Sequence, residues 1–160
     1  MTIQSRMTSV LALTLVAASI QAARAETASS SFQVGMSVVA TCSISAADMT
    51  FNGITTGTTS QNDADSTLSV NCSNGAPYAV SLSNGSNFSG GRRLEGGGSF
   101  INYALFKDSS RTAEWSLASP ISAMGSGTTQ VHTVYGRIPA GQAVPNMGNY
   151  ADTIVATVSY

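Results

Sequence analysis

Residues 68–82 read LSVNCSNGAPYAVSL, two short runs in which apolar and polar side chains alternate. The apolar positions of the two runs are Leu68, Val70 and Cys72, and then Tyr78, Val80 and Leu82. Such a period of two puts every second side chain on the same face of a β-strand. Between the runs stands Asn74-Gly75, a favoured turn dipeptide. The stretch therefore predicts two half-buried strands separated by a turn.

The same period recurs along most of the chain. Further alternating runs are Phe32, Val34, Met36 and Val38; Ile101, Tyr103 and Leu105; Val131, Thr133 and Tyr135, opposite Val134 and Ile138; and Ile154, Ala156, Val158 and Tyr160. Asn52-Gly53 and Asn84-Gly85 supply further turn signals. After Ile20 no segment has a convincing helical face. About seven short strands predict an all-β fold, an antiparallel β-sandwich.

The first 25 residues have the pattern of a secretory signal peptide. Arg6 precedes an uncharged apolar run over residues 10–20, and Ala23-Arg24-Ala25 has the small-x-small form of a cleavage site. The alternative, a membrane anchor, is disfavoured because a spanning helix needs about 20 apolar residues. The mature chain is therefore expected to begin at Glu26, with no membrane span after it.

Charge is scarce. Only 15 of 160 residues are charged, or 9%, against roughly 25% in ordinary soluble domains. Without the signal peptide the net charge is 5 − 8 = −3, so neither nucleic acid nor an anionic membrane is an expected partner. One histidine and two cysteines leave little material for a metal site or a catalytic cluster. We therefore expect no enzyme activity, no metal and no cofactor.

The two cysteines, Cys42 and Cys72, form the only possible pair. Export to an oxidising compartment favours a disulfide between them. A closed loop of about 30 residues corresponds to about 3–4 kcal/mol of stabilisation in the chain-entropy model. Two free buried thiols are the alternative.

The alternating run at residues 32–38 allows two interpretations. It is either the first strand of the protein's own sandwich or a detachable strand that completes a neighbouring molecule. Four apolar side chains at strict period two would contribute at most about 6–12 kcal/mol if fully buried. The pattern by itself fits both.

A set of motifs spread over the mature chain resembles the spore coat protein U domain family, which includes subunits of archaic (Csu-type) chaperone–usher pili. The motifs, in chain order, are the run ending four residues before Cys42; Phe51-Asn52-Gly53; Ser66 to Cys72; Tyr78 to Leu82; Arg93-Leu94; Asn102 to Asp108; Arg111-Thr112; Trp115; Val134 to Ile138; Ala140-Gly141-Gln142; and Gly148 to Thr153 with the closing strand to Tyr160. Each fragment is weak evidence, but the ordered set is specific.

This resemblance implies an incomplete immunoglobulin-like antiparallel β-sandwich completed by a donor strand. It divides the chain into a signal peptide (1–25), a donor-strand extension (26–40) and a pilin domain (41–160). The implied donor plugs are Phe32, Val34, Met36 and Val38, and the implied groove strand, Thr153 to Tyr160, contributes Ile154, Val158 and Tyr160.

The implied partners are a periplasmic chaperone, an outer-membrane usher and neighbouring subunits in a head-to-tail polymer. The implied function is that of a structural pilus subunit, which passes through the periplasm to a surface fimbria and supports adhesion or biofilm formation. The implied mechanism is strand exchange, without catalysis.

Two departures from the family pattern stand out. Asn52 adds a residue where relatives commonly have Phe directly before Gly, so the turn there is expected to differ. The glycine-rich stretch 90–98 is expected to be a flexible hairpin loop or, alternatively, a loop specialised for contact.

Other interpretations remain open at this stage. A coat or outer-surface protein would have the same fold. A self-contained carbohydrate-binding sandwich could use Trp115, Tyr103 and Tyr135 as a platform, although aromatic core packing is commoner. Asp63 and Asp65 are expected in a solvated loop rather than a calcium site. His132 is expected to be structural, since no catalytic partner is evident.

Overall fold

The computed structural model describes residues 24–55, 57–58, 60–144 and 146–160. Residues 37–160 form one compact unit, separate from the residues that precede it. The expected signal peptide, residues 1–25, lies almost wholly outside the described residues. In the described part of the chain no helix is long and apolar enough to cross a membrane.

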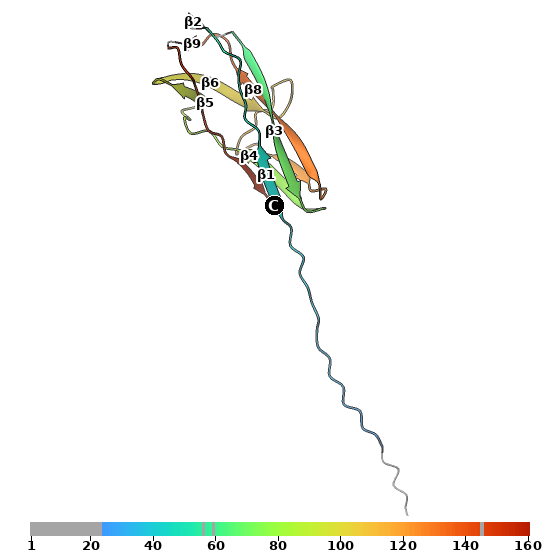
Figure 1. The fold of residues 1–160 in the computed structure, drawn as a ribbon. Helices are drawn as coiled ribbons and strands as arrows, with labels where there is room; N and C mark the ends of the chain where they lie inside the picture. Colours follow the sequence, from blue (N-terminus) through green and yellow to red (C-terminus); the bar gives the residue numbers. More distant parts are fainter. Residues whose placement is uncertain (1–23, 56, 59, 145) are drawn as a thin grey trace, which may run out of the picture. The chain divides into compact units, whose positions relative to one another are not determined.

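The described chain is all-β and antiparallel, as predicted. The larger sheet has the order β1-β3-β8-β6-β5, a three-stranded sheet has the order β10-β4-β7, and β2 pairs with β9 (Figure 1). The strands are β1 (Cys42–Ala46), β2 (Gly57–Thr58), β3 (Asn62–Cys72), β4 (Pro77–Leu82), β5 (Arg92–Gly96), β6 (Ser99–Phe106), β7 (Ile121–Met124), β8 (Thr129–Ile138), β9 (Ala143–Val144) and β10 (Ala156–Ser159).

The stretch 68–82 connects the two sheets. Its first run is the end of β3 in the larger sheet and its second run is β4 in the smaller sheet. The turn at Asn74-Gly75 lies between them, and Gly75 adopts a φ of 77°, which favours glycine. The two predicted strands therefore face each other across the core, which is why this stretch decides the sandwich.

The core lies between the inner faces of the two sheets, and Trp115 is fully buried within it. The indole of Trp115 donates its N–H to the carbonyl oxygen of Val80 at 2.9 Å. Cys42 and Cys72 are opposite each other on β1 and β3 and form the predicted disulfide. The bridge ties an edge strand of the larger sheet to the core.

The prediction of a hairpin loop over residues 90–98 is wrong for residues 92–96, and only residues 97–98 form the turn of a hairpin. The central part of this stretch is β5, paired with β6, and it buries Arg92 to 4% exposure. The guanidinium donates to the carbonyl oxygens of Ser83 at 2.7 Å and Trp115 at 2.9 Å, and its other nitrogen lies 3.7 Å from the Glu114 carboxylate. Backbone carbonyl oxygens therefore stabilise the buried charge of Arg92, at a position where the sequence predicts an exposed loop.

Residues 32–38 are not part of either sheet in the described chain. The described residues before Cys42 form neither strand nor helix. The four alternating side chains are each between 85% and 88% exposed. The compact domain thus begins its sheets at β1.

Candidate functional site: an open groove between the sheets

Two of the edge strands in the described chain, β1 and β10, border a groove between the sheets. β1 pairs only with β3, and β10 pairs only with β4. The strands lie in different sheets on the same side of the sandwich, next to a groove of about 930 Å³. A strand from another chain can form hydrogen bonds with such unpaired edges and cover the exposed core.

The groove exposes the core of the domain. Its floor consists of buried or half-buried apolar side chains from both sheets, including Leu82, Leu94, Ile101, Leu105, Val134 and Ile138. One wall is a first arm, residues 46–55, which follows β1. The other wall is a second arm, residues 146–152, which leads into β10.

The first arm lies close to the larger sheet at Gly136 on β8. An added Cβ there would meet the ends of the Met49 and Phe51 side chains, which would have to shift to make room. The Asn62 side chain donates to the carbonyl oxygen of Asn52 at 2.6 Å, which fixes the middle of the arm. The added residue Asn52 is thus anchored.

The second arm rests on β5 in the same way. Ala151 and Glu95 exchange two backbone hydrogen bonds of 2.9 Å. The ring of Tyr150 lies over Gly96, where an added Cβ would stand 2.6 Å from the Asn149 carbonyl oxygen and 2.8 Å from the ring. The missing side chain at Gly96 is therefore what lets the arm lie close.

Asp152 fixes the start of the groove strand. Its carboxylate accepts hydrogen bonds from the Tyr103 hydroxyl at 2.7 Å and from the backbone N–H groups of Ser86 and Asn87 at 2.8 and 3.1 Å. Burial and the bond to Asp152 both raise the pKa of Tyr103, so its hydroxyl stays a donor. Asp152 thereby ties the end of the second arm to the floor.

The two arms are joined at one end of the groove. The first arm leads into β2, the second follows β9, and these strands pair at Gly57 with Val144 and at Thr58 with Ala143. β2 and β9 lie at one end of the domain, and the C-terminus lies at the other, beside the start of β1 (Figure 1). The walls are thus tied at one end.

The Gly96→Ala variant is expected to lose about 1–3 kcal/mol of unfolding free energy, because the added methyl overlaps backbone and ring atoms. Urea denaturation measures this loss. Gly91→Ala is the matched control, because nothing lies within 4 Å of that position and its φ is ordinary. Equal unfolding midpoints for the two variants would contradict the account of the second arm.

The predicted groove-strand residues are partly brought together. Ile154 lines the groove, and Val158 is half-buried against the core. Tyr160 is 63% exposed and follows the end of β10. The sequence did not identify the two arms, because Met49-Thr50-Phe51 and Tyr150 lie in segments without a full alternating pattern.

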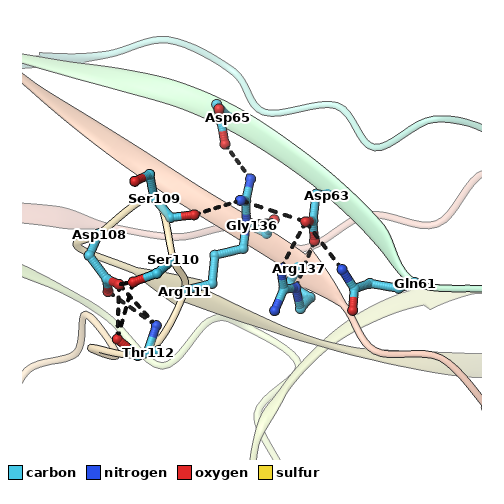
Figure 2. A network of polar contacts seen from close by, with 10 residues as sticks. All are labelled: Gln61, Asp63, Asp65, Asp108, Ser109, Ser110, Arg111, Thr112, Gly136 and Arg137. Atoms are coloured by element: carbon cyan, nitrogen blue, oxygen red, sulfur yellow. Dashed lines mark hydrogen bonds and ion pairs between the residues drawn. The ribbon is translucent and has the colours of Figure 1, made fainter.

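Asp63 and Asp65 lie on a strand, so the expectation of a solvated loop is wrong. They lie on β3 and face two arginines (Figure 2). Arg137 forms two hydrogen bonds with Asp63 at 2.8 and 2.9 Å, and Arg111 donates to Asp65 at 2.6 Å. The bonds from Arg137 hold the pKa of Asp63 below its ordinary value. Among the described residues no cluster of metal ligands occurs.

The suggested sugar platform is wrong. Trp115 is fully buried, Tyr103 is 7% exposed, and the Arg111 guanidinium lies 5.5 Å from the centre of the Tyr135 ring. The three aromatic side chains therefore present no common open face.

His132 is half-buried on β8 and contacts two aromatic residues of the core. Its Nε2 lies 2.9 Å from the Tyr78 hydroxyl, and its ring packs edge-on against Trp115. Burial lowers its pKa, so the neutral ring is the stable form in the folded domain.

The lowered pKa of His132 predicts a pH dependence. The unfolded chain, with a histidine pKa near 6.5, takes up the proton first. The contribution of the neutral His132 ring to the unfolding free energy is thus fully present above that pH and decreases as the pH drops below it. The loss is expected to be under about 1 kcal/mol, since the ring is only partly buried. Urea midpoints from pH 8 to 5 measure it, and His132→Gln should remove this component. Parallel curves would contradict the prediction.

Comparison with known proteins identifies a family. The model of the family described as Spore Coat Protein U domain matches residues 28–157. A comparison with curated proteins finds no match. Among solved structures the chain is similar to a chaperone–tip adhesion subunit pre-assembly complex, CsuC-CsuE, from the archaic chaperone–usher Csu pili of Acinetobacter baumannii.

That structural match has 26% sequence identity and a TM-score of 0.57. It covers 77% of this chain and 40% of the matched chain, so the present protein spans less than half of that relative. The family model, in contrast, covers most of the present sequence, including both arms and the strands of the described residues apart from the end of β10. The chain therefore belongs to the spore coat protein U domain family.

Proposed function

We propose that the protein is a structural subunit of a surface pilus, polymerised by donor-strand exchange. The observation that carries the proposal is the groove of about 930 Å³, which exposes core between the unpaired edges of β1 and β10. A strand inserted there would add main-chain hydrogen bonds and bury apolar plugs. The spore coat protein U family and the similarity to a pilus subunit complex support it.

The strand that fills the groove is supplied by another copy. Residues 26–40 form the donor extension, and its plugs are Phe32, Val34, Met36 and Val38. Their exposure of 85–88% leaves apolar surface that a soluble chain seldom presents. Donation from copy to copy is head-to-tail, so it produces an open fibre rather than a closed ring.

Before assembly the groove needs a temporary occupant. A subunit with exposed core and free edges is prone to aggregate. A periplasmic chaperone that covers the groove keeps it soluble, and an outer-membrane usher exchanges the chaperone for the next subunit. The solved relative is itself a chaperone–subunit complex. This role places residues 1–25 as a signal peptide, the subunit in the periplasm and the fibre at the cell surface, where it supports adhesion or biofilm formation.

The proposal predicts different assembly states for two chains. Residues 26–160, oxidised in the periplasm, should form polymers that resist mild heating in detergent. Residues 40–160, which lack the donor, should form none. Size-exclusion chromatography and unboiled gels measure both. A stable monomer from the longer chain, and an unfolded protein from the shorter one, would overturn donor-strand exchange.

A further inference from the structure

The path from the donor segment into the domain is short. Thr41 is fixed to the turn after β3, because its carbonyl oxygen accepts the Ser73 N–H at 2.9 Å and its own N–H donates to the Ser73 hydroxyl at 3.0 Å. Only two residues separate Thr41 from the last plug, Val38. Three residue steps span at most about 11 Å. If Val38 fills a neighbour's groove, Thr41 therefore lies close to that neighbour.

The two ends of the domain differ. The base is the end with Thr41, Ser73 and the turn Asn74-Gly75. The rim is the end with β2, β9 and Met147, which lines the groove. β10 runs from rim to base, since Ser159 pairs with Ala79 near the start of β4 and Ala156 pairs with Leu82 at its end.

This polarity selects a direction for the donor. A donor strand parallel to β10 would leave Val38 at the base of the copy that receives it. The base of each copy would then contact the bases of two neighbours, the copy that receives its donor strand and the copy whose donor strand it holds. An antiparallel donor leaves Val38 at the rim, so each base meets one rim, an arrangement that repeats without crowding. A fibre therefore places the base of one copy on the rim of the next.

The base carries a hollow that suits such a contact. It has a volume of about 400 Å³ and is lined by uncharged residues of β1, β3 and the turn before β8, among them Ser43, Asn71 and Gly127. The stretches 38–47 and 66–83, which contain every lining residue except Gly127, include no Asp, Glu, Lys or Arg. Covering the hollow therefore requires no desolvation of a charged side chain from these stretches.

The rim carries an exposed, uncharged and flexible side chain. Met147 is 91% exposed, and the neighbouring Asn146 fixes the segment by donating to the Ser99 hydroxyl at 2.7 Å. A methionine adapts its shape to an irregular hollow. We infer that Met147 of one copy packs into the base hollow of the copy whose donor strand it holds. This inference rests on the proposed function and names the second contact between consecutive copies.

Photo-crosslinking of the full chain tests the contact. A benzophenone amino acid replaces Met147, polymers are assembled from mixed isotopically labelled and unlabelled copies, and crosslinked peptides are identified by mass spectrometry. The main intermolecular product should join position 147 to residues 41–43 or 71–73 of the other copy. The same probe at Leu117, which is 57% exposed and away from the groove, should lose that product.

The outcomes separate the two proposals. If the unsubstituted chain does not polymerise, the proposed function fails and the contact fails with it. If polymers form but the probe at 147 crosslinks elsewhere or only within its own copy, the contact alone is overturned. A probe at Asn71 that links base to base would likewise overturn it, because that product reports the parallel direction.

Discussion

Val34→Asp is expected to abolish polymerisation while leaving the domain folded. Val34 is a central plug of the donor segment and is 88% exposed in the free chain, so the substitution removes no contact within the domain. In an assembled fibre the same side chain would be buried among apolar groups, where an unpaired carboxylate costs several kcal/mol. That cost is comparable with the whole contribution of the plugs, at most about 6–12 kcal/mol.

The adjacent position provides the control. Gln33 faces the opposite side of the same alternating segment, so Gln33→Asp adds the same charge without burying it. Polymers of the Gln33 variant should match those of the unsubstituted chain on unboiled gels. Equal loss in both variants would indicate a general effect of charge, and polymerisation of Val34→Asp would show that this side chain does not enter a groove.

Loss of the disulfide is expected to have the second largest effect. Replacing Cys42 and Cys72 by serine removes about 3–4 kcal/mol in the chain-entropy model, a large part of the usual total of 5–15 kcal/mol. The bridge also fixes the start of β1, an edge strand that pairs only with β3 and forms one side of the groove. The double variant should therefore unfold more easily and form few polymers.

Thermal or urea unfolding of the two chains measures this effect. The matched control alters the neighbouring cross-strand pair, Ser43 and Asn71, which lies on the outer face of the same strands. Alanine at both positions should change the unfolding free energy by well under the disulfide effect. A double cysteine variant with unchanged stability would show that β1 is held by its ladder alone.

The strands that the sequence predicts well are those that are buried on one face. The runs in β3, β4, β6 and β8 alternate, because one face of each packs on the core. β5 was missed because it carries Arg92 at an inward position and glycines on both sides. A buried arginine that backbone carbonyls solvate leaves no apolar signal, so tertiary contacts decided that strand.

The same reason explains which parts of the functional site can be predicted from the sequence. The donor plugs are visible in the sequence because a detachable strand carries its own alternation. The arms are not, because Gly136 and Gly96 place them through missing side chains against residues far away in the chain. Such close approaches depend on the folded arrangement, and a single sequence contains no local pattern for them.

The central claim, that the groove accepts the segment 32–38 as a strand, is tested most directly by adding that peptide to the chain 40–160 and measuring thermal unfolding. A peptide at a hundred times its Kd should stabilise the domain by about 2.7 kcal/mol, and a peptide with aspartate at positions 34 and 36 should not. Stabilisation by the first peptide alone is the result that the account predicts. No shift, or an equal shift with both peptides, would contradict it.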